Sequence, residues 1–310
     1  MNLLLTGATG FLGQKLSKVL LSLEHIKLTT AGRRASGLSS VRDICVGDID
    51  ATTDWSLALK GQKVVIHAAA RAHVMNETAE DPLDVYRRVN CEGTLNLARQ
   101  AAAEGVRRFV FISTIKVNGS ETPSGQPFTA DQSVNPQDPY AVSKWEAEQG
   151  LDVLSAETGL EVVIIRPPMI YGSGVKGNFA RLIALIEKGI PLPFGAIHNQ
   201  RSLVSVDNLV DLIQLCTHHP AAANQVFLAS DGQDLSTTEL LQFVAAGAGK
   251  NAHLFSVPSS FLEWAGVLLH KENEAHRLLK SLQIDISKNR TVLGWEPPVS
   301  VDEGFKRCFR

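Results

Sequence analysis

The 310-residue sequence is poor in cysteine, in aromatic residues and in net charge. Its four cysteines are widely scattered, with no Cys-x-x-Cys pair, so neither a zinc site nor a disulfide framework is predicted. A net charge of −2 gives no indication of nucleic acid or an anionic membrane as a partner. Apolar stretches such as 261–269 are too short or too interrupted to span a bilayer. No metal, no nucleic acid and no membrane are therefore expected as partners.

The first apolar run, residues 3–5, leads directly into a glycine-rich turn. It is short and has neither a basic lead nor a cleavage site, so we interpret it as a strand rather than a signal. The 44% hydrophobic and 20% charged composition is ordinary for a globular protein. A cytoplasmic protein with one large domain, or a domain with a smaller appendage, is expected.

Short apolar runs alternate with helical patterns through the first half of the chain, which predicts parallel strands joined by helical crossovers. The expected fold class is α/β: a Rossmann-type doubly wound parallel sheet with a smaller, discontinuous C-terminal substrate-binding region. The predicted strands are 2–6, 27–31, 41–46, 64–67, 108–112 and 161–165. The predicted helices are 11–22, 82–104 and 139–157.

The pattern changes after Arg166-Pro167-Pro168, where helices become separated by segments rich in proline and glycine. A helix at 204–217 and a strand at 225–228 are expected to return to the sheet. The predicted division is an NAD(P)-binding domain of residues 1–170, to which 200–230 return, and a mainly substrate-binding region of 171–199 and 231–310.

A strand, a glycine turn and an amphipathic helix follow one another in Leu3-Leu-Leu-Thr-Gly7-Ala-Thr-Gly10-Phe-Leu-Gly13. Glycines permit close approach of the backbone to phosphate, and the start of the helix offers unpaired N–H groups to the anion. Because the turn lies between a strand and a helix, phosphate binding is favoured over a merely flexible turn. The expected cofactor contacts here are Gly7, Thr9, Gly10, Phe11, Leu12 and Gly13.

The second strand ends at Thr30-Ala-Gly-Arg33-Arg34, without the acidic residue that usually binds the ribose hydroxyls of NAD. Arginine favours the 2′-phosphate of NADP, so NADP(H) is the favoured cofactor and NAD(H) the alternative. The alternative is that both arginines are simply solvated residues of the turn. Asp48 and Ile49 are expected to meet the adenine. Small residues after the fourth strand are expected to line the cofactor beside a packed or cofactor-facing histidine: His67, Ala68, Ala69 and Ala70.

Tyr140 and Lys144 lie four residues apart and therefore share one face of a predicted helix. A fixed cation stabilises a phenolate and lowers the tyrosine pKa from about 10, which makes Tyr140 a candidate acid or base. The alternative is a solvated lysine beside a half-buried tyrosine, a pair that occurs by chance in many helices.

The order of these motifs resembles the extended short-chain dehydrogenase/reductases, more narrowly the nucleotide-sugar branch of their NAD-dependent epimerase/dehydratase family, which is UDP-glucose 4-epimerase-like. The resemblance covers nearly the whole chain. Its motifs are the glycine turn, Asp48-Ile49, His67-Ala-Ala-Ala70, Val89-Asn90, Phe111-Ile-Ser-Thr114 and Tyr140-x-x-x-Lys144. The resemblance implies that Tyr140 is the general acid or base, that Lys144 binds the nicotinamide ribose, and that Thr114 hydrogen-bonds the reacting oxygen.

Further site residues are implied by the resemblance alone. Asn90, Pro167 and Met169 are expected beside the cofactor, and Ser113, Asn178 and Arg201 beside the substrate. The planar guanidinium of Arg201 suits a diphosphate, and the alternative is a salt bridge with Asp207. The charged segment 271–277 is interpreted as a solvated helix face rather than a cover over the nucleotide.

Ile115 and Lys116 follow Thr114 where sugar dehydratases of this branch commonly carry acids, so dehydration is disfavoured. The expected function is hydride transfer to C4 of a UDP-linked 4-keto (6-deoxy) hexose or hexosamine, with Tyr140 as general acid. The alternative is a UDP-hexose or UDP-N-acetylhexosamine 4-epimerase with tightly bound NAD. A non-catalytic dinucleotide sensor ranks third. The resemblance also implies a homodimer formed through the helices at 82–104 and 139–157.

Overall fold

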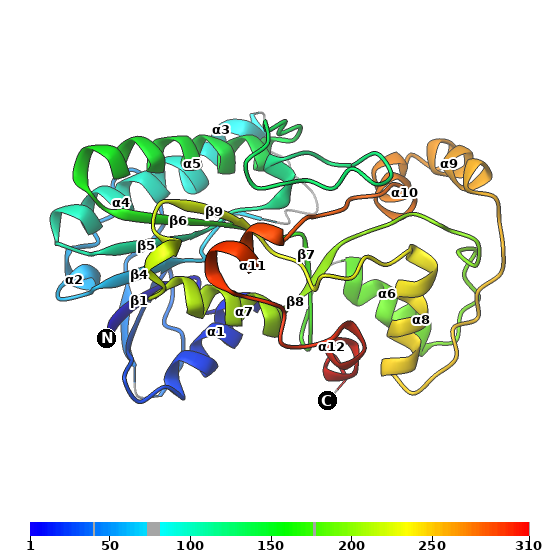
Figure 1. Ribbon diagram of the computed structural model, residues 1–310, viewed down its shortest axis with the longest axis horizontal. Coiled ribbons are helices and arrows are strands. Elements are labelled where there is room, and N and C mark those ends of the chain that lie inside the picture. Colours follow the sequence, from blue (N-terminus) through cyan, green and yellow to red (C-terminus); the bar gives the residue numbers. More distant parts are fainter. Residues whose placement is uncertain (40, 73–80, 176–177, 310) are drawn as a thin grey trace.

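A seven-stranded, fully parallel sheet forms the centre of the larger part of the molecule in a computed structural model (Figure 1). The structure describes residues 1–39, 41–72, 81–175 and 178–309. The strand order is β3-β2-β1-β4-β5-β6-β9. The strands are β1 (Asn2–Thr6), β2 (Lys27–Gly32), β3 (Arg42–Cys45), β4 (Val64–His67), β5 (Arg108–Ile112), β6 (Glu161–Arg166) and β9 (Gln225–Leu228).

Helices cover both faces of this sheet (Figure 1). Helices α1 (Phe11–Leu21) and α7 (Val206–Cys216) pack on one face, and α2 (Ser56–Leu59), α4 (Gly93–Ala103) and α5 (Pro139–Thr158) pack on the other. Every residue of β5 is buried, as expected for a parallel strand enclosed between two helical layers. The predicted doubly wound α/β fold is confirmed.

Local sequence signals set the limits of α5, the helix that carries Tyr140. The Asp138 side chain accepts a hydrogen bond from the backbone N–H of Ala141, and Pro139 occupies the first turn. Gly159 ends the helix with φ +75°, a left-handed conformation that glycine adopts without steric cost.

The predicted helix at 82–104 is interrupted. It consists of α3 (Pro82–Arg87), a π-helical turn η1 (Arg88–Glu92) and α4. A π-turn widens the helix locally and often accompanies a functional site. Two three-residue strands, β7 (Met169–Tyr171) and β8 (Leu203–Ser205), form a separate parallel pair that the sequence did not indicate.

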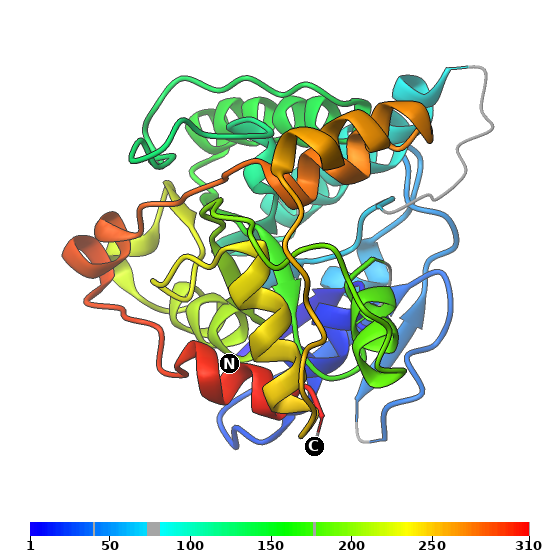
Figure 2. The same cartoon turned by 90° about the vertical axis from the view of Figure 1, so that its right-hand side faces the viewer.

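Most of the remaining helices gather beyond the carboxyl ends of the strands and form a smaller, discontinuous region (Figures 1 and 2). This region has its own apolar core. Helix α11, by contrast, packs against β9 of the central sheet. The remaining elements are η2 (Ile115–Val117), η3 (Pro220–Ala222), α6 (Asn178–Glu187), α8 (Thr237–Gly247), α9 (Ser259–Leu268), α10 (Glu272–Leu279), α11 (Ser287–Leu293) and α12 (Val301–Arg307).

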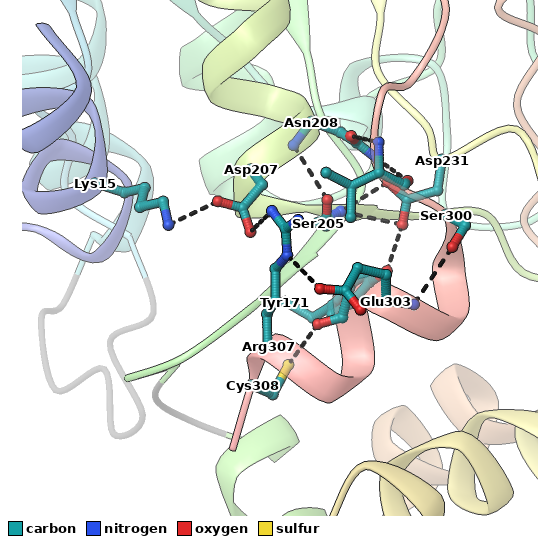
Figure 3. Close-up of polar contacts among 12 residues, drawn as sticks. Lys15, Tyr171, Ser205, Asp207, Asn208, Asp231, Ser300, Glu303, Arg307 and Cys308 are labelled. Atoms are coloured by element: carbon teal, nitrogen blue, oxygen red, sulfur yellow. Dashed lines mark hydrogen bonds and ion pairs between the residues drawn. The ribbon is translucent and has the colours of Figure 1, made fainter. Parts of the chain in front are cut away.

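A buried polar cluster joins the small strand pair to the C-terminal helix (Figure 3). The Tyr171 hydroxyl donates to Asp231 at 2.6 Å, and the same carboxylate accepts from the Ser205 N–H at 2.9 Å and from the Asn208 amide at 2.7 Å. The Tyr171 ring stacks on Phe305 of α12 with centroids 4.3 Å apart. Tyr171 therefore has a structural role, because it joins β7 to α12.

Candidate active site

The order of the strands reverses between the neighbouring strands β1 and β4. In such sheets ligands bind at this point, just beyond the carboxyl ends of the strands. The glycine turn lies there. Gly7 has φ +76°, and a Cβ on it would stand 2.7 Å from the carbonyl carbon of Ala68. A Cβ on Gly13 would stand 2.0 Å from the Gly7 carbonyl oxygen, so only glycine lets α1 begin this close to the turn. No side chain caps α1, and its first N–H groups stay available to an anion.

A cavity of about 1090 Å³ opens at this edge, large enough for a dinucleotide. Its walls come from residues 7–10, 30–36, 48–49 and 68–72, together with Asp43, Val85, Arg88 and Val89. The predicted cofactor contacts that line it are Gly7, Thr9, Gly10, Arg33, Arg34, Asp48, Ile49, Ala68, Ala69 and Ala70.

The loop that carries Arg33 and Arg34 is fixed by a carboxylate on the next strand. Asp43 of β3 accepts hydrogen bonds from the Thr30 hydroxyl at 2.8 Å and from the Ser36 hydroxyl at 2.8 Å. These donors and others lower the pKa of Asp43 against the opposing effect of burial. Asp43 therefore orders the arginine loop at the end of the cavity.

His67 packs in the core and is not among the residues that line the cavity, so its role as a cofactor contact stays a prediction. Its Nδ1 lies 2.7 Å from Thr6 Oγ1 and its Nε2 lies 3.0 Å from Thr94 Oγ1. Burial, and then the positive charge of Lys144, lower the His67 pKa to about 3, so the ring is neutral.

Asn90 acts on the cavity wall indirectly. Its side-chain amide accepts from the Arg71 N–H at 2.8 Å and donates to the Arg71 carbonyl at 3.1 Å. It also donates to the Ser143 hydroxyl of α5 at 3.1 Å. Asn90 thus clamps the segment after β4 against the helix that carries Tyr140.

Other predicted cofactor contacts support the site without lining the cavity. The side chain of Leu12 is buried in the core, and Phe11 packs beside that core. The Pro167 carbonyl accepts from the Ile115 N–H at 2.9 Å, which ties the end of β6 to the end of β5. Met169 begins β7 and is 40% exposed. Their roles as cofactor contacts stay predictions.

Lys144 is buried beneath the candidate site, where its Nζ lies 3.8 Å from the centroid of the Phe111 ring. Within the described ranges its ammonium has no hydrogen-bond partner. Burial lowers the Lys144 pKa to about 7, although the negative charge of Glu148, one turn along the helix, opposes this shift. Lys144 is not among the residues that line the cavity. A buried donor without a partner among the described residues fits a ligand that supplies acceptors, such as ribose hydroxyls.

Tyr140 stands at the start of α5, with its ring 6.0 Å from that of Tyr86. Burial raises the pKa of Tyr140, and the negative charge of Asp138 and the electrostatic influence of the Tyr86 phenol add to this effect. The prediction that Lys144 lowers this pKa is therefore wrong for the polypeptide alone. Thr114 follows β5, and its hydroxyl accepts from the Lys116 N–H at 3.3 Å.

Ser113 belongs to a buried ionic network, and its role as a substrate contact stays a prediction. Its hydroxyl donates to Glu148, a carboxylate that also forms an ion pair with Arg166 at 2.5 Å. Arg166 donates in turn to the Asn118 side chain at 3.0 Å. The Ser113 hydroxyl is thus engaged in this network, whereas the Thr114 hydroxyl bonds the backbone of η2.

Arg201 lies in the smaller region, where its Nη1 donates to the Lys280 carbonyl at 2.9 Å. Burial and then the nearby positive charge of Arg277 lower the Arg201 pKa to about 10. In the described part of the chain, no carboxylate lies within ion-pair distance of either guanidinium. Asp207, its alternative partner, pairs instead with Lys15 and Arg307 (Figure 3). Two close, unpaired cations attract an anion such as a diphosphate.

Two features of this region bear on the remaining predictions. Asn178 begins α6, but its side chain lies outside the described residues. Arg277 of α10, predicted as part of a solvated helix face, lies close enough to Arg201 for its positive charge to lower the Arg201 pKa. The signal for Arg277 in the sequence was a basic residue in the last turn of a helix whose first turn is acidic.

Two further results concern other classes of ligand. None of the helices in the described ranges is both long and apolar enough to cross a membrane. Among the same residues, no group of three or more His, Cys, Asp or Glu side chains is placed to hold a metal ion.

A glycine cradle at the switch point of a doubly wound sheet, with a Tyr-x-x-x-Lys helix beside it, defines a Rossmann-type nicotinamide-dependent enzyme. More narrowly, the chain belongs to the NAD-dependent epimerase/dehydratase family, whose model matches residues 3–229. The predicted resemblance is thereby confirmed.

Relatives agree with this assignment. The chain is 49% identical over 307 residues to a UDP-glucose 4-epimerase of Vibrio cholerae, covering 99% of this chain and 94% of the relative. It is 29% identical to an N-acetyl-alpha-D-glucosaminyl-diphospho-ditrans,octacis-undecaprenol 4-epimerase of Escherichia coli O157:H7, covering 83% and 75%. The predicted preference for NADP(H) finds no support among the relatives, and NAD is favoured.

Solved structures share the fold. A UDP-glucuronic acid 4-epimerase of Bacillus cereus in complex with NAD superposes with a TM-score of 0.79 at 22% identity, covering 100% of this chain and 96% of the other. A UDP-glucose 4-epimerase of Thermotoga maritima with UDP-glucose gives a TM-score of 0.77 at 23% identity, covering 100% and 97%.

Proposed function

We propose that the protein is a 4-epimerase of nucleoside-diphosphate sugars, such as a UDP-hexose, that retains NAD through its catalytic cycle. The observation that carries the proposal is the buried Lys144 ammonium, which has no hydrogen-bond partner among the described residues and lies four residues beyond Tyr140. The 49% identical relative named a UDP-glucose 4-epimerase favours epimerisation over the net reduction that the sequence first suggested.

Tyr140 performs the proton transfer of this reaction, removing the proton of the sugar 4-hydroxyl as the C4 hydrogen leaves as hydride. A bound oxidised nicotinamide supplies the hydride acceptor. Thr114 holds the reacting oxygen, and Lys144 holds the cofactor ribose and adds positive charge near the phenolate. Tyr140 returns the proton once the hydride has been delivered to the opposite face of C4.

Arg201 and Arg277 bind the substrate diphosphate in this proposal. Arg277 belongs to residues 231–310, which together with 171–199 we propose cover the sugar nucleotide. Arg201 lies within 200–230 in the sequence, but its backbone pairs with Leu235 and Leu282 of that region. A second cavity of about 360 Å³ lies beside the two arginines, with Asn199 and Lys280 in its wall. Asn178, at the start of α6, is proposed as a further substrate contact.

Reduction of a 4-keto sugar is the second candidate, because Arg33 and Arg34 line the cavity where a 2′-phosphate of NADP would lie. The two functions differ in what the purified protein holds. An epimerase releases NAD on denaturation and interconverts UDP-glucose and UDP-galactose, or their N-acetylated forms, without added cofactor. A reductase is free of nucleotide and oxidises added NADPH only when a 4-keto sugar nucleotide is present. A protein that does neither overturns both.

A further inference from the structure

Lys116 and Asp138 form an ion pair at the edge of the candidate active site, 2.5 Å from Nζ to Oδ2. The pair joins two elements. Lys116 belongs to η2, the short turn whose N-cap is Thr114, and Asp138 is the N-cap of α5, two residues before Tyr140. The backbone N–H of Lys116 bonds the Thr114 hydroxyl, so one turn links the pair to the group proposed to hold the reacting oxygen.

Asp138 has two tasks that conflict electrostatically. Its Oδ1 accepts from the Ala141 N–H at 2.8 Å and so anchors the first turn of α5. Its negative charge also opposes formation of a phenolate on Tyr140. An asparagine would cap the helix as well as an aspartate does, so capping alone does not call for a charged residue.

We propose that Lys116 is a positioning residue for Tyr140: by pairing with Asp138 it cancels the negative charge that the helix N-cap would otherwise place beside the reacting hydroxyl. The proposal rests on the proposed role of Tyr140 in proton transfer and extends it to a residue that touches neither cofactor nor substrate.

Other charged and titratable groups around Tyr140 do not replace this pair. Tyr86 of α3 lies beside the Tyr140 ring. Arg71 lies over the Tyr86 ring, with its Cζ 5.6 Å from the ring centroid. On α5 itself, Lys144 lies one turn further along, and the negative charge of Glu148 acts on it. Lys116 is therefore the cation in direct contact with Asp138.

The test compares Lys116→Met, Asp138→Asn and the double variant by the pH dependence of kcat/KM, in whichever direction the wild-type enzyme turns over. Lys116→Met leaves Asp138 unpaired, so the rising limb should move up by about 0.5 pH unit, as expected for a partly exposed pair. Asp138→Asn keeps the cap and should move the limb down. The double variant should return it close to the wild-type position.

Opposite shifts separate charge compensation from structural damage, which would lower activity at every pH without moving the limb. Lys306→Met removes the cation of an exposed pair with Asp302 on α12 and is the matched control. The proposal would be overturned if the rising limb of kcat/KM did not move in the two single variants, or moved in the same direction in both.

A measurement without turnover separates this proposal from the proposed function. The chain has three tyrosines, so ring-carbon NMR resonances of labelled tyrosine can be assigned with single Tyr→Phe variants. Lys116→Met should shift the Tyr140 resonance, Asp138→Asn should shift it in the opposite sense, and Lys306→Met should leave it unchanged. If the wild type is inactive yet these shifts occur, the function fails and the charge pairing stands. A Tyr140 resonance indifferent to both variants overturns the pairing.

Discussion

At the residue scale, Lys144 shows how a binding group departs from the stable arrangement. In the part of the chain that the structure describes, its buried ammonium has no hydrogen-bond partner, which destabilises the polypeptide. In the proposed function a bound ligand supplies the missing acceptors. Function and stability therefore conflict at this position, as they commonly do in active sites.

This conflict gives a pH-dependent prediction for Lys144→Met. Burial lowers the lysine pKa from 10.5 to about 7, so between these values the unfolded chain binds a proton that the folded chain does not. Wild-type stability therefore gains from rising pH in that window, and the variant lacks this gain. In the cofactor-free protein the variant should melt higher at pH 7, because a fall of the pKa from 10.5 to about 7 corresponds to up to roughly 5 kcal/mol of unfolding free energy. The difference should shrink towards pH 10; a constant difference in thermal melts would contradict the pKa assignment.

Tyr140→Phe tests the proton transfer directly. The phenyl ring keeps the contact with Tyr86 but removes the hydroxyl, so turnover should fall by about 10²–10⁴-fold. The amount of nucleotide released on denaturation should stay the same. Tyr86→Phe is the matched control and should keep most of the turnover in a sugar-interconversion assay. Equal losses in both variants would remove Tyr140 from its proposed role.

At the element scale, the glycine turn and α1 act as one unit. Gly13→Ala would place a Cβ 2.0 Å from the Gly7 carbonyl oxygen, whereas Gly10→Ala places it at 3.2 Å from the same atom. The first variant should lose nucleotide retention and about 1–3 kcal/mol of unfolding free energy, as overpacked sites do. The second should keep most of both. Urea denaturation and the yield of released nucleotide measure the two effects, and similar behaviour of the two variants would contradict the close approach.

Local patterns were sufficient to predict these elements but not their contacts. The strand, turn and helix at Gly7 have their signals within adjacent residues, and so does the Tyr140–Lys144 spacing. Ser113 was predicted as a substrate contact because no local pattern connects it with Glu148, 35 residues away. The π-turn in η1 and the three-residue β7 and β8 were missed for a related reason: they depend on packing between elements rather than on periodicity.

At the scale of the whole molecule, Arg201 and Arg277 come from segments far apart in the chain and meet only in the folded smaller region. Arg201→Met and Arg277→Met should each raise the KM for a nucleoside-diphosphate sugar about 10-fold or more, because each removes a charge-assisted bond to phosphate. Nucleotide retention in the larger domain should be unaffected. Lys250→Met, which removes a cation bonded to the Glu187 carbonyl, is the control. An unchanged KM in both arginine variants would place the diphosphate elsewhere.

The outer faces of α4 and α5 provide the last prediction, a homodimer formed by pairing these two helices across a twofold axis. On α5 the side chain of Val153 is 57% exposed, although it is apolar. Burying a carboxylate there without a partner is costly, so Val153→Glu should weaken association by about 10-fold or more. Sedimentation should give twice the 33.6 kDa chain mass for the wild type and a shift towards the monomer for the variant. Val267→Glu on α9, equally exposed and distant from α5, should stay dimeric. If both variants dissociate alike, or the wild type is a monomer, the interface is not on these helices.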